Sequence, residues 1–273
     1  MGRKGKGDES VAEVDDLDLP PSPKPSKPRQ VLTFLGETAL AIVVTLVITA
    51  LLRVFVFQVF QVPSGSMEET LELKDRIVAT RISDFDRGDI VVFEDPDAMW
   101  MGEQPEATNP VRRVLEELYL LPDSSQGYLV KRVVGMPGDN VVCCNQQGQI
   151  TVNGTALDET GYLYTDASGL PVAPSDTPFD VTVPAGHIFV LGDHRDRSGD
   201  SRLHMCETTP ADVPAGSYGF IPIDSVVGPV KAIVAPLGRI TTFSTPDTFA
   251  SVPDASIDAP AEPIVAEGSC GGS

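Results

Sequence analysis

The chain has 273 residues, of which 41% are hydrophobic, which is enough for the core of one large or two small domains. Its formal net charge is −19, and the excess negative charge lies after residue 57, because residues 1–31 hold six Lys/Arg and six Asp/Glu and Glu37 balances Arg53. An acidic domain without a basic stripe repels phosphates, so the composition argues against nucleic-acid binding.

The first predicted segment, residues 1–31, is disordered and cytoplasmic. Its last part, residues 19–31, is rich in proline and contains three cations and no acid. This composition is typical of an extended linker. The cations precede a long apolar run, and positive charge on one side of such a run predicts that this side stays in the cytoplasm.

We expect residues 32–59 to form a transmembrane anchor. The 23 residues from Thr38 to Phe60 carry one charge, Arg53. As a helix they would measure about 35 Å, against a hydrocarbon thickness of about 30 Å. A cleavable signal peptide is the alternative, but the run exceeds the usual apolar length of about 7–15 residues and has no small-x-small end. The sequence therefore predicts a single-pass protein of the cell membrane, with the lipid bilayer as a partner and the acidic domain outside.

A serine lies on a turn directly after the anchor. Pro63 and Gly65 flank it between an apolar alternation and an amphipathic stretch, which predicts a tight turn with Ser66 at its centre. We expect the Ser66 hydroxyl to be exposed and fixed in position. A solvated turn hydroxyl without a role is the alternative.

The rest of the domain, residues 60–240, is predicted to be mostly β, with antiparallel sheet and turn-rich loops. Runs of β-branched residues bounded by turn residues indicate the strands. These runs lie in 76–93, 128–134, 150–155, 187–191, 217–222 and 226–234, and Asn153-Gly154 is typical of a hairpin turn. Residues 95–128 form an insertion, with a short helix predicted after Asn109-Pro110.

From about Thr241 to residue 273 the chain is rich in Ser, Thr, Pro, Ala and Asp without periodicity, so a disordered acidic tail is expected. Four cysteines fit an oxidising compartment: Cys143, Cys144, Cys206 and Cys270. Four cysteines allow three pairings, and the sequence does not choose among them. A bridge from Cys143 or Cys144 to Cys206 is a weak preference, and free buried thiols are the alternative.

Lys131 is unusual among the strand residues. It is followed by Arg132 within an apolar strand, and consecutive side chains point to opposite faces, so one of the two cations should face the apolar side. Burial lowers the pKa of a lysine and makes it available as a base. A serine hydroxyl needs such a base to become a nucleophile, and Ser–Lys is a known pairing. A solvated lysine at a strand edge is the alternative.

Other chemistries receive less support from the sequence. Three histidines, His187, His194 and His204, allow a Ser-His-Asp triad, but their spacing does not favour one. The acids after residue 192 could be metal ligands, but arginines are interleaved and the spacing misses the calcium-loop pattern. We therefore expect no metal and no cofactor.

Four blocks occur in the order found in type I bacterial signal peptidases (leader peptidases), and the chain resembles this Ser–Lys protease family. The blocks are Pro63-Ser-Gly-Ser-Met67, Arg87-Gly-Asp-Ile-Val-Val-Phe93, Lys131-Arg-Val-Val-Gly-Met-Pro-Gly-Asp139 and Gly192-Asp-His-Arg-Asp-Arg-Ser-Gly-Asp-Ser-Arg202. The resemblance covers roughly residues 60–236. It implies a membrane-bound serine endopeptidase that removes signal peptides of secreted preproteins after small-x-small motifs.

The resemblance also implies roles for particular residues. Ser66 would be the nucleophile and Lys131 the general base, with the Ser64 hydroxyl and the Ser66 backbone N–H forming the oxyanion hole. Ser198 and Asp200 would orient the lysine, and the pairs Arg132–Asp193 and Asp200–Arg202 would brace the site. Seven residues would line shallow substrate pockets, where the peptide adds as an extended strand: Phe60, Val62, Pro63, Met67, Leu71, Leu129 and Val130.

The chain departs from the family pattern at three positions. His194 and Arg197 stand where asparagines are usual, and Glu69 stands where proline is common. These departures concern the geometry of the loops. Two other functions stay open at this point: a catalytically silent membrane-anchored binding module, and a Ser–Lys protease with a narrow or self-directed substrate.

Overall fold

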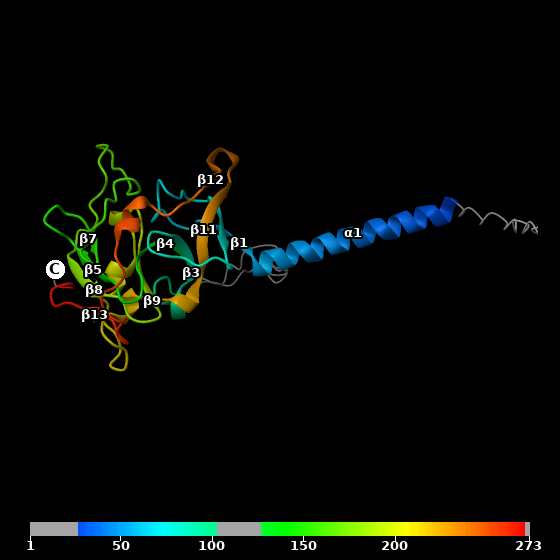
Figure 1. Cartoon of the computed structure of the whole chain (residues 1–273). Coiled ribbons are helices and arrows are strands. Elements are labelled where there is room, and N and C mark those ends of the chain that lie inside the picture. The colour runs from blue at the N-terminus through cyan, green and yellow to red at the C-terminus, as the bar shows by residue number, and fades with distance from the viewer. Residues whose placement is uncertain (1–26, 103–126, 271–273) are drawn as a thin grey trace, which may run out of the picture. The chain divides into compact units, whose positions relative to one another are not determined.

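The computed structural model describes residues 27–102 and 127–270 (Figure 1). By its internal contacts the chain divides into Met1–Val47 and Ile48–Ser273. All described residues of the first unit belong to helix α1 (Lys27–Phe55), which extends past Val47. The second unit is rich in β-strands, and every strand pair in its described part is antiparallel. The predicted fold class is therefore confirmed.

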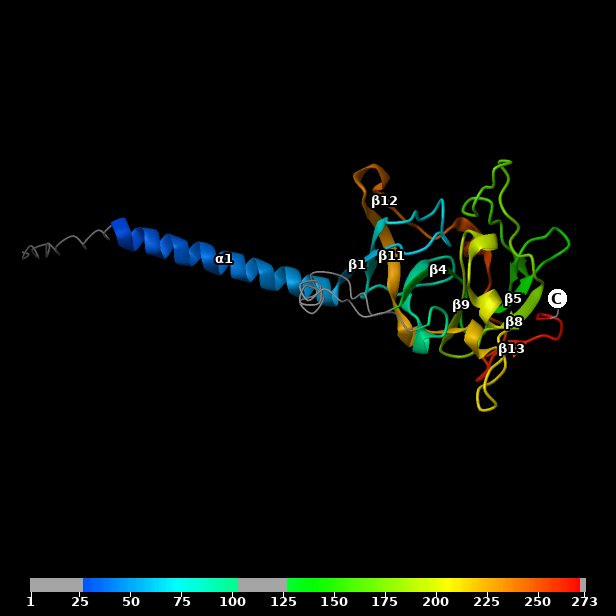
Figure 2. The same ribbon diagram turned by 180° about the vertical axis from the view of Figure 1, so that it is seen from behind.

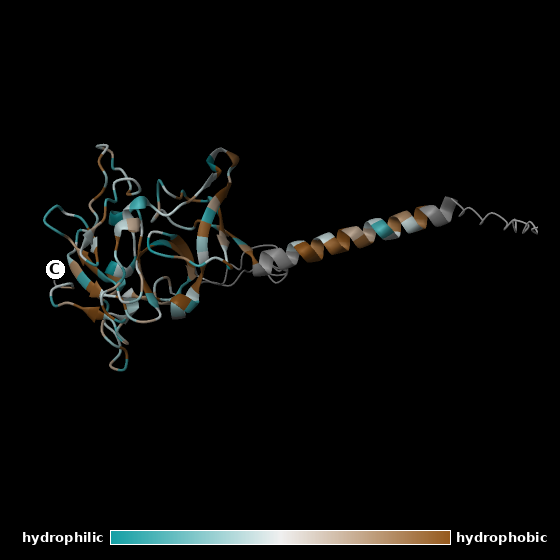
Figure 3. Cartoon of the chain, in the orientation of Figure 1, coloured by the Kyte–Doolittle hydropathy of each residue, from teal (hydrophilic) through white to brown (hydrophobic). Residues whose placement is uncertain are grey.

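Helix α1 is apolar along its middle, as the brown residues in Figure 3 show. Residues Val31–Thr49 are long and apolar enough to cross a membrane by length and composition. The bounds differ from the prediction at both ends. The helix begins at Lys27, beside Pro28, which is tolerated in a first helical turn. It ends at Phe55, and Phe57–Gln61 forms strand β1 instead of the last turn of an anchor.

The larger sheet has the strand order β1-β2-β11-β3-β4-β9-β10, and β12 pairs with β11. Alternating or fully buried apolar residues account for these strands, because side chains in a strand point alternately to the two faces. Their bounds are β1 Phe57–Gln61, β2 Arg76–Thr80, β3 Ile90–Glu94, β4 Tyr128–Gly135, β9 His187–Leu191, β10 Ile221–Pro222, β11 Val226–Ala235 and β12 Thr241–Thr242.

A smaller sheet has the order β13-β8-β5-β6-β7. Its strands are β5 Asn140–Cys143, β6 Thr151–Val152, β7 Thr155–Ala156, β8 Phe179–Thr182 and β13 Ile264–Val265. Asn153 and Gly154 form the turn between β6 and β7, both with positive φ, as the hairpin prediction requires. In both ribbon views β1 and β11 of the larger sheet lie at one end of the β-rich unit and the smaller sheet at the other, with β9 next to the smaller sheet (Figures 1 and 2).

Short helical segments connect the strands. One α-helix, α3 (Ser201–His204), follows β9 and is capped by Asp200, whose side chain accepts a hydrogen bond from the Arg202 N–H. The 3-10 turns are η1 Pro96–Ala98, η2 Arg195–Arg197, η3 Ser217–Gly219, η4 Ile223–Ser225, η5 Leu237–Arg239 and η6 Asp247–Ser251. The helix predicted after Asn109 lies outside the described residues.

The C-terminal residues contradict the prediction of a disordered tail. Residues 241–270 contribute β12, η6 and β13, and Phe249 and Val252 are buried in the core cluster around the smaller sheet. Buried apolar residues are few in this segment and do not recur at the spacing of a strand or a helix. The prediction from composition was therefore disorder. The cysteine preference is also wrong, because Cys206 pairs with Cys270 and Cys143 with its neighbour Cys144.

Candidate active site

Ser66 lies on the turn between β1 and β2, and apolar side chains hold this turn in place. Met67 and Leu71 have no exposed surface, and the Leu71 N–H donates to the Met67 carbonyl. The His194 N–H donates to the Ser66 carbonyl at 3.0 Å. Ser66 lies on a turn, as predicted, but it is only 6% exposed, so the expectation of an exposed hydroxyl is wrong.

Lys131 reaches this serine from the middle of β4. The strand is hydrogen-bonded to β3 on one side and to β9 on the other, and its side chains are buried on both faces of the sheet. Lys131 is 2% exposed, and its Nζ lies 2.5 Å from Ser66 Oγ. Ser64 Oγ lies 3.4 Å from the same hydroxyl oxygen. The structure thus brings together the three side chains that the sequence placed at the centre of the site.

Burial changes the acid–base properties of Lys131. Its pKa is lowered to about 8, chiefly by desolvation; Asp200 and Asp193 act to raise the pKa and the Arg202 charge acts to lower it. An amine with this pKa is neutral in a large fraction of molecules at slightly alkaline pH. It can therefore accept a proton from the serine hydroxyl that it contacts.

The loop after β9 supplies the charges around the lysine. Arg202 forms two hydrogen bonds to Asp200, from Nε to Oδ1 at 2.9 Å and from Nη2 to Oδ2 at 2.8 Å. Burial raises the pKa of Asp200, but Arg202 and Lys131 outweigh this and hold it below its ordinary value. Ser198 Oγ is buried and makes no hydrogen bond to the described residues, so its expected contact with Lys131 is not formed.

Arg132 is buried as fully as Lys131, at 3% exposure, whereas the alternation argument required only one buried cation. It keeps its charge because it forms a bidentate ion pair with Asp193, at 2.8 and 2.6 Å. It also donates to the Gly88 carbonyl at 2.7 Å and lies 4.2 Å from the centre of the Tyr162 ring. Thr70 Oγ1 donates to Asp193 at 2.7 Å, which connects this pair to the turn of Ser66.

The residues expected to line substrate pockets are divided between two apolar clusters. Five of them pack in one cluster beside the Ser66 turn: Phe60, Val62, Met67, Leu71 and Val130. Leu129 belongs to another cluster, with Val91 and Val133, because it points to the opposite face of β4 from Val130. Pro63 and Ser64 are exposed, so the edge of the turn is open to solvent.

The alternative chemistries find no support in the described part of the chain. The side-chain partners of Ser66 Oγ there are Lys131 and Ser64, and no histidine is among them. Within residues 27–102 and 127–270, no group of three or more His, Cys, Asp or Glu side chains could hold a metal ion.

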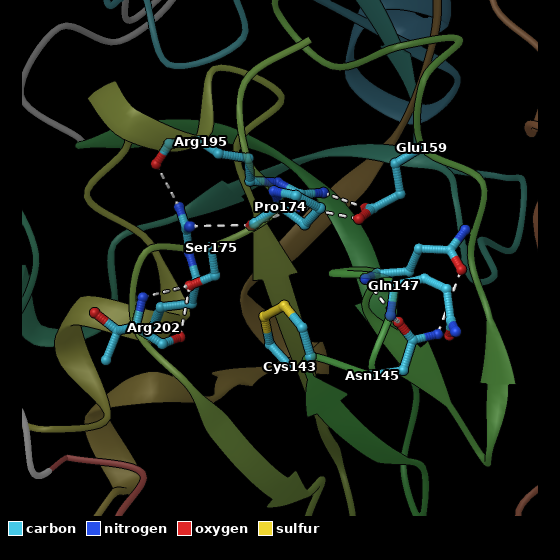
Figure 4. Close-up of a disulfide and its surroundings, with 11 residues drawn as sticks. Cys143, Asn145, Gln147, Glu159, Pro174, Ser175, Arg195 and Arg202 are labelled. Carbon is cyan, nitrogen blue, oxygen red and sulfur yellow. Dashed lines mark hydrogen bonds and ion pairs between the residues drawn. A yellow bond between two sulfur atoms is a disulfide. The ribbon is translucent and has the colours of Figure 1, made fainter.

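The sequence analysis missed a second buried arginine that shapes the same loop. Arg195 pairs with Glu159, and both side chains are almost completely buried (Figure 4). Arg195 and Arg202 both donate to the Pro174 carbonyl, at 2.9 and 3.3 Å. Figure 4 also shows the disulfide at Cys143 near these residues. Glu159 and Pro174 lie in a loop-rich stretch without a motif, so no local signal indicated them.

Comparisons with known proteins show that the chain is similar to signal peptidases. The family model described as signal peptidase, peptidase S26, matches residues 35–235, which is more than half of the chain. Signal peptidase I of Mycobacterium tuberculosis is 32% identical over 255 residues, covering 86% of this chain and 80% of the relative. Probable signal peptidase I of Mycobacterium leprae is 33% identical over 233 residues, covering 75% and 78%. A crystal structure of a signal peptidase I from Enterococcus faecalis covers 54% of this chain and 97% of its own, with 23% identity and a TM-score of 0.32.

Proposed function

The chain belongs to the signal peptidase family, peptidase S26, and from this premise we propose that Ser66 is its nucleophile and Lys131 its general base. The protein is a serine endopeptidase of the membrane that cleaves signal peptides from preproteins. The observation that carries the assignment of residues is the 2.5 Å contact between a buried amine and a turn hydroxyl.

The proposed reaction begins when neutral Lys131 takes the hydroxyl proton of Ser66 and the Ser66 oxygen attacks the scissile carbonyl carbon. The oxyanion that forms accepts hydrogen bonds from the Ser66 N–H and the Ser64 hydroxyl. Lys131 then gives its proton to the leaving amine, and the peptide bond breaks. In the second half, Lys131 takes a proton from water, which attacks the acyl ester. The ester bond then breaks, and Lys131 returns the proton to the Ser66 oxygen, so both groups are restored.

Substrate selection would follow from the apolar cluster beside the Ser66 turn. Phe60, Val62 and Val130 are buried there, so pockets against these side chains would be shallow and would favour small side chains at the first and third positions before the cut. The peptide would lie as an extended strand along the exposed edge at Pro63 and Ser64. A small-x-small motif meets both requirements.

The site would act on the outer side of the membrane. α1 provides the apolar span, and the cations Lys24, Lys27 and Arg29 near its start favour a cytoplasmic N-terminus. In this orientation the acidic domain is extracytoplasmic, where exported preproteins emerge.

The test is cleavage of a purified preprotein by the full chain in detergent, with the cut located by mass spectrometry. We expect cleavage after a small-x-small motif, and we expect Ser66→Ala and Lys131→Ala to abolish it without loss of fold by circular dichroism. Lys231→Ala, a lysine of strand β11, is the matched control and should cleave normally. Near-normal turnover by either site variant would disprove the mechanism, and no cleavage by the native chain would favour a silent binding module.

A further inference from the structure

His194, where the family pattern usually has asparagine, lies between the Ser66 turn and two neighbouring loops. Its side chain is only 2% exposed. The imidazole ring stacks on Tyr164, with 3.7 Å between ring centres and 19° between planes. Nδ1 lies 3.0 Å from Glu68 Oε2, and Nε2 lies 3.2 Å from Asp196 Oδ1. The ring therefore bridges the nucleophile turn, through Glu68, to the loop after β9.

The contact between His194 and Glu68 is defined by the 3.0 Å distance between Nδ1 and Oε2 and not by a hydrogen bond. Nδ1 is at ion-pair distance from the carboxylate, but its orientation leaves it without a hydrogen-bond partner among the described residues. The carboxylates of Glu68 and Asp196 flank one buried ring, so the ring is packed between the nucleophile turn and the loop after β9. Both carboxylates are partly exposed to solvent, so the cluster contributes little to the free energy of folding.

The surroundings of the ring are themselves fixed. The Tyr164 N–H donates to the Asp193 carbonyl at 3.1 Å, and the Tyr164 carbonyl accepts from the Val172 N–H at 2.9 Å. Glu69, next to Glu68, accepts a hydrogen bond from the Thr165 N–H at 3.0 Å. The Ser66 turn is thus attached to the Tyr164 loop at two neighbouring points, and one of them passes through His194.

We propose that His194 is a positioning residue for Ser66, acting through the Glu68 carboxylate. The proposal deepens the peptidase function and rests on it. Glu68 is two residues after the nucleophile, and its Oε2 folds back over Gly65, 3.5 Å from where a Cβ on that residue would lie. Holding Glu68 therefore restrains the chain on both sides of Ser66. A nucleophile displaced by about 1 Å can lose about a hundredfold in rate.

The main-chain bond from residue 194 to the Ser66 carbonyl does not depend on the side chain, so substitutions isolate the ring. His194→Phe keeps the volume and the stack on Tyr164 but removes both nitrogens. Glu68→Gln keeps the shape of the partner and removes its charge. His204→Phe is the matched control, because His204 is also buried, stacked on an aromatic ring (Trp100) and paired with a carboxylate (Glu207), but away from the Ser66 turn.

The experiment measures kcat and KM for preprotein cleavage by the full chain in detergent, together with Tm. We expect His194→Phe and Glu68→Gln each to lower kcat about tenfold with KM within about twofold and Tm within about 4 °C. The double variant should be no slower than either single variant, and His204→Phe should keep the native kcat.

A His194→Phe enzyme with native kcat, an effect on KM alone, or additive effects in the double variant would each overturn the proposal. Equal loss of kcat in His204→Phe would do so as well, since it would indicate general destabilisation. The native chain and Ser66→Ala are assayed in parallel. If the native chain cleaves and Ser66→Ala does not, the proposed function holds, and any of these outcomes then disproves only the role of His194.

Discussion

Lys131 and Arg132 are adjacent cations on one buried strand, and their surroundings give them opposite properties. The Arg132 guanidinium has a bidentate carboxylate partner and stays charged. Lys131 instead contacts a neutral hydroxyl, and Asp200 acts on it through space, so burial dominates and its pKa falls to about 8. The difference between a structural cation and a base is therefore set by the partner that each side chain reaches.

The rate of cleavage should rise with pH through the pKa of Lys131. The base must be neutral to accept the Ser66 proton, and its pKa is lowered from 10.5 to about 8. We expect kcat/KM to increase about tenfold per pH unit below that value and to level off above it. A pH–rate profile measured on an unchanged substrate checks this, and a flat profile between about pH 6 and 8 would contradict it.

Replacing Lys131 by methionine should inactivate the enzyme and stabilise its fold at neutral pH. The pKa of Lys131 is lower in the folded chain than in the unfolded chain, so the protonated amine is less stable in the native state and its burial destabilises the fold. The penalty is complete below about pH 8, approaches about 3 kcal/mol, and disappears as pH rises through the unfolded value near 10.5. Urea unfolding of Lys131→Met should show a gain at pH 7 that shrinks by pH 10. An equal gain at both pH values would exclude this cause.

At the level of single residues, motif and alternation predicted the meeting of Ser66 and Lys131. They did not predict that Arg132 is also buried, because a strand buried on both faces has no solvent side for the second cation. The partners of Arg132 could not be found either. Gly88, Tyr162 and Thr70 are far from it in the sequence and carry no pattern that links them to it.

The loop between β9 and α3 is the element on which the site depends. Its first residue, Gly192, lies directly against the Ser66 turn, and a Cβ there would be 2.5 Å from the Ser66 carbonyl oxygen and would also collide with Ser198 Oγ. The close approach of two main chains at this point allows the 194–66 hydrogen bond to form.

Gly192→Ala should therefore reduce kcat by at least about tenfold, because the added methyl group must displace the nucleophile turn. Gly199→Ala is the control in the same loop, since a Cβ at 199 would meet nothing closer than 3.9 Å and φ there is not positive. The measurement is kcat for preprotein cleavage by the Gly192→Ala and Gly199→Ala variants. Native activity in Gly192→Ala would mean that the loop can move without cost to the site.

Among the elements, the strands were predictable because β-branched alternation is local, and β9 and the β6–β7 turn agree with it. The residue at which the membrane anchor ends could not be predicted. Val54 to Phe60 is apolar enough to continue a helix, but Phe57–Gln61 is an edge strand that pairs with Arg76–Thr80. Hydropathy alone does not distinguish a last helical turn from a short apolar strand, and the deciding hydrogen bonds come from residues almost 20 positions away.

At the scale of the whole molecule, the C-terminal segment encloses the domain that begins at the nucleophile turn. Thr245 donates to Asp89 at 2.6 Å, the Ala266 N–H donates to the Asp180 carbonyl, and Cys270 is bonded to Cys206. Each contact joins positions more than 60 residues apart, so none leaves a trace in a local sequence window. Composition predicted disorder here because it counts apolar residues and ignores where they pack.

Phe249 makes this segment relevant to the site. Its ring lies on Gly88, where φ is +85° and a Cβ would come within 2.5 Å of Phe249, and it stacks loosely on Tyr162 at 6.3 Å. Gly88 and Tyr162 both contact the Arg132 side chain, as Asp193 does. Removing the ring should therefore loosen the Arg132–Asp193 pair as well as the core.

We expect Phe249→Ala to lower the free energy of unfolding by about 3 kcal/mol, since a buried ring is lost. It should also lower kcat below the melting temperature, through the weaker support of Arg132. Ile257→Ala is the control in the same segment, because Ile257 is 55% exposed and its loss should change stability by less than about 0.5 kcal/mol. Urea unfolding followed by activity at a temperature where both variants are folded separates the two effects. If Phe249→Ala is less stable but keeps the native kcat, the segment supports the fold and has no influence on the site.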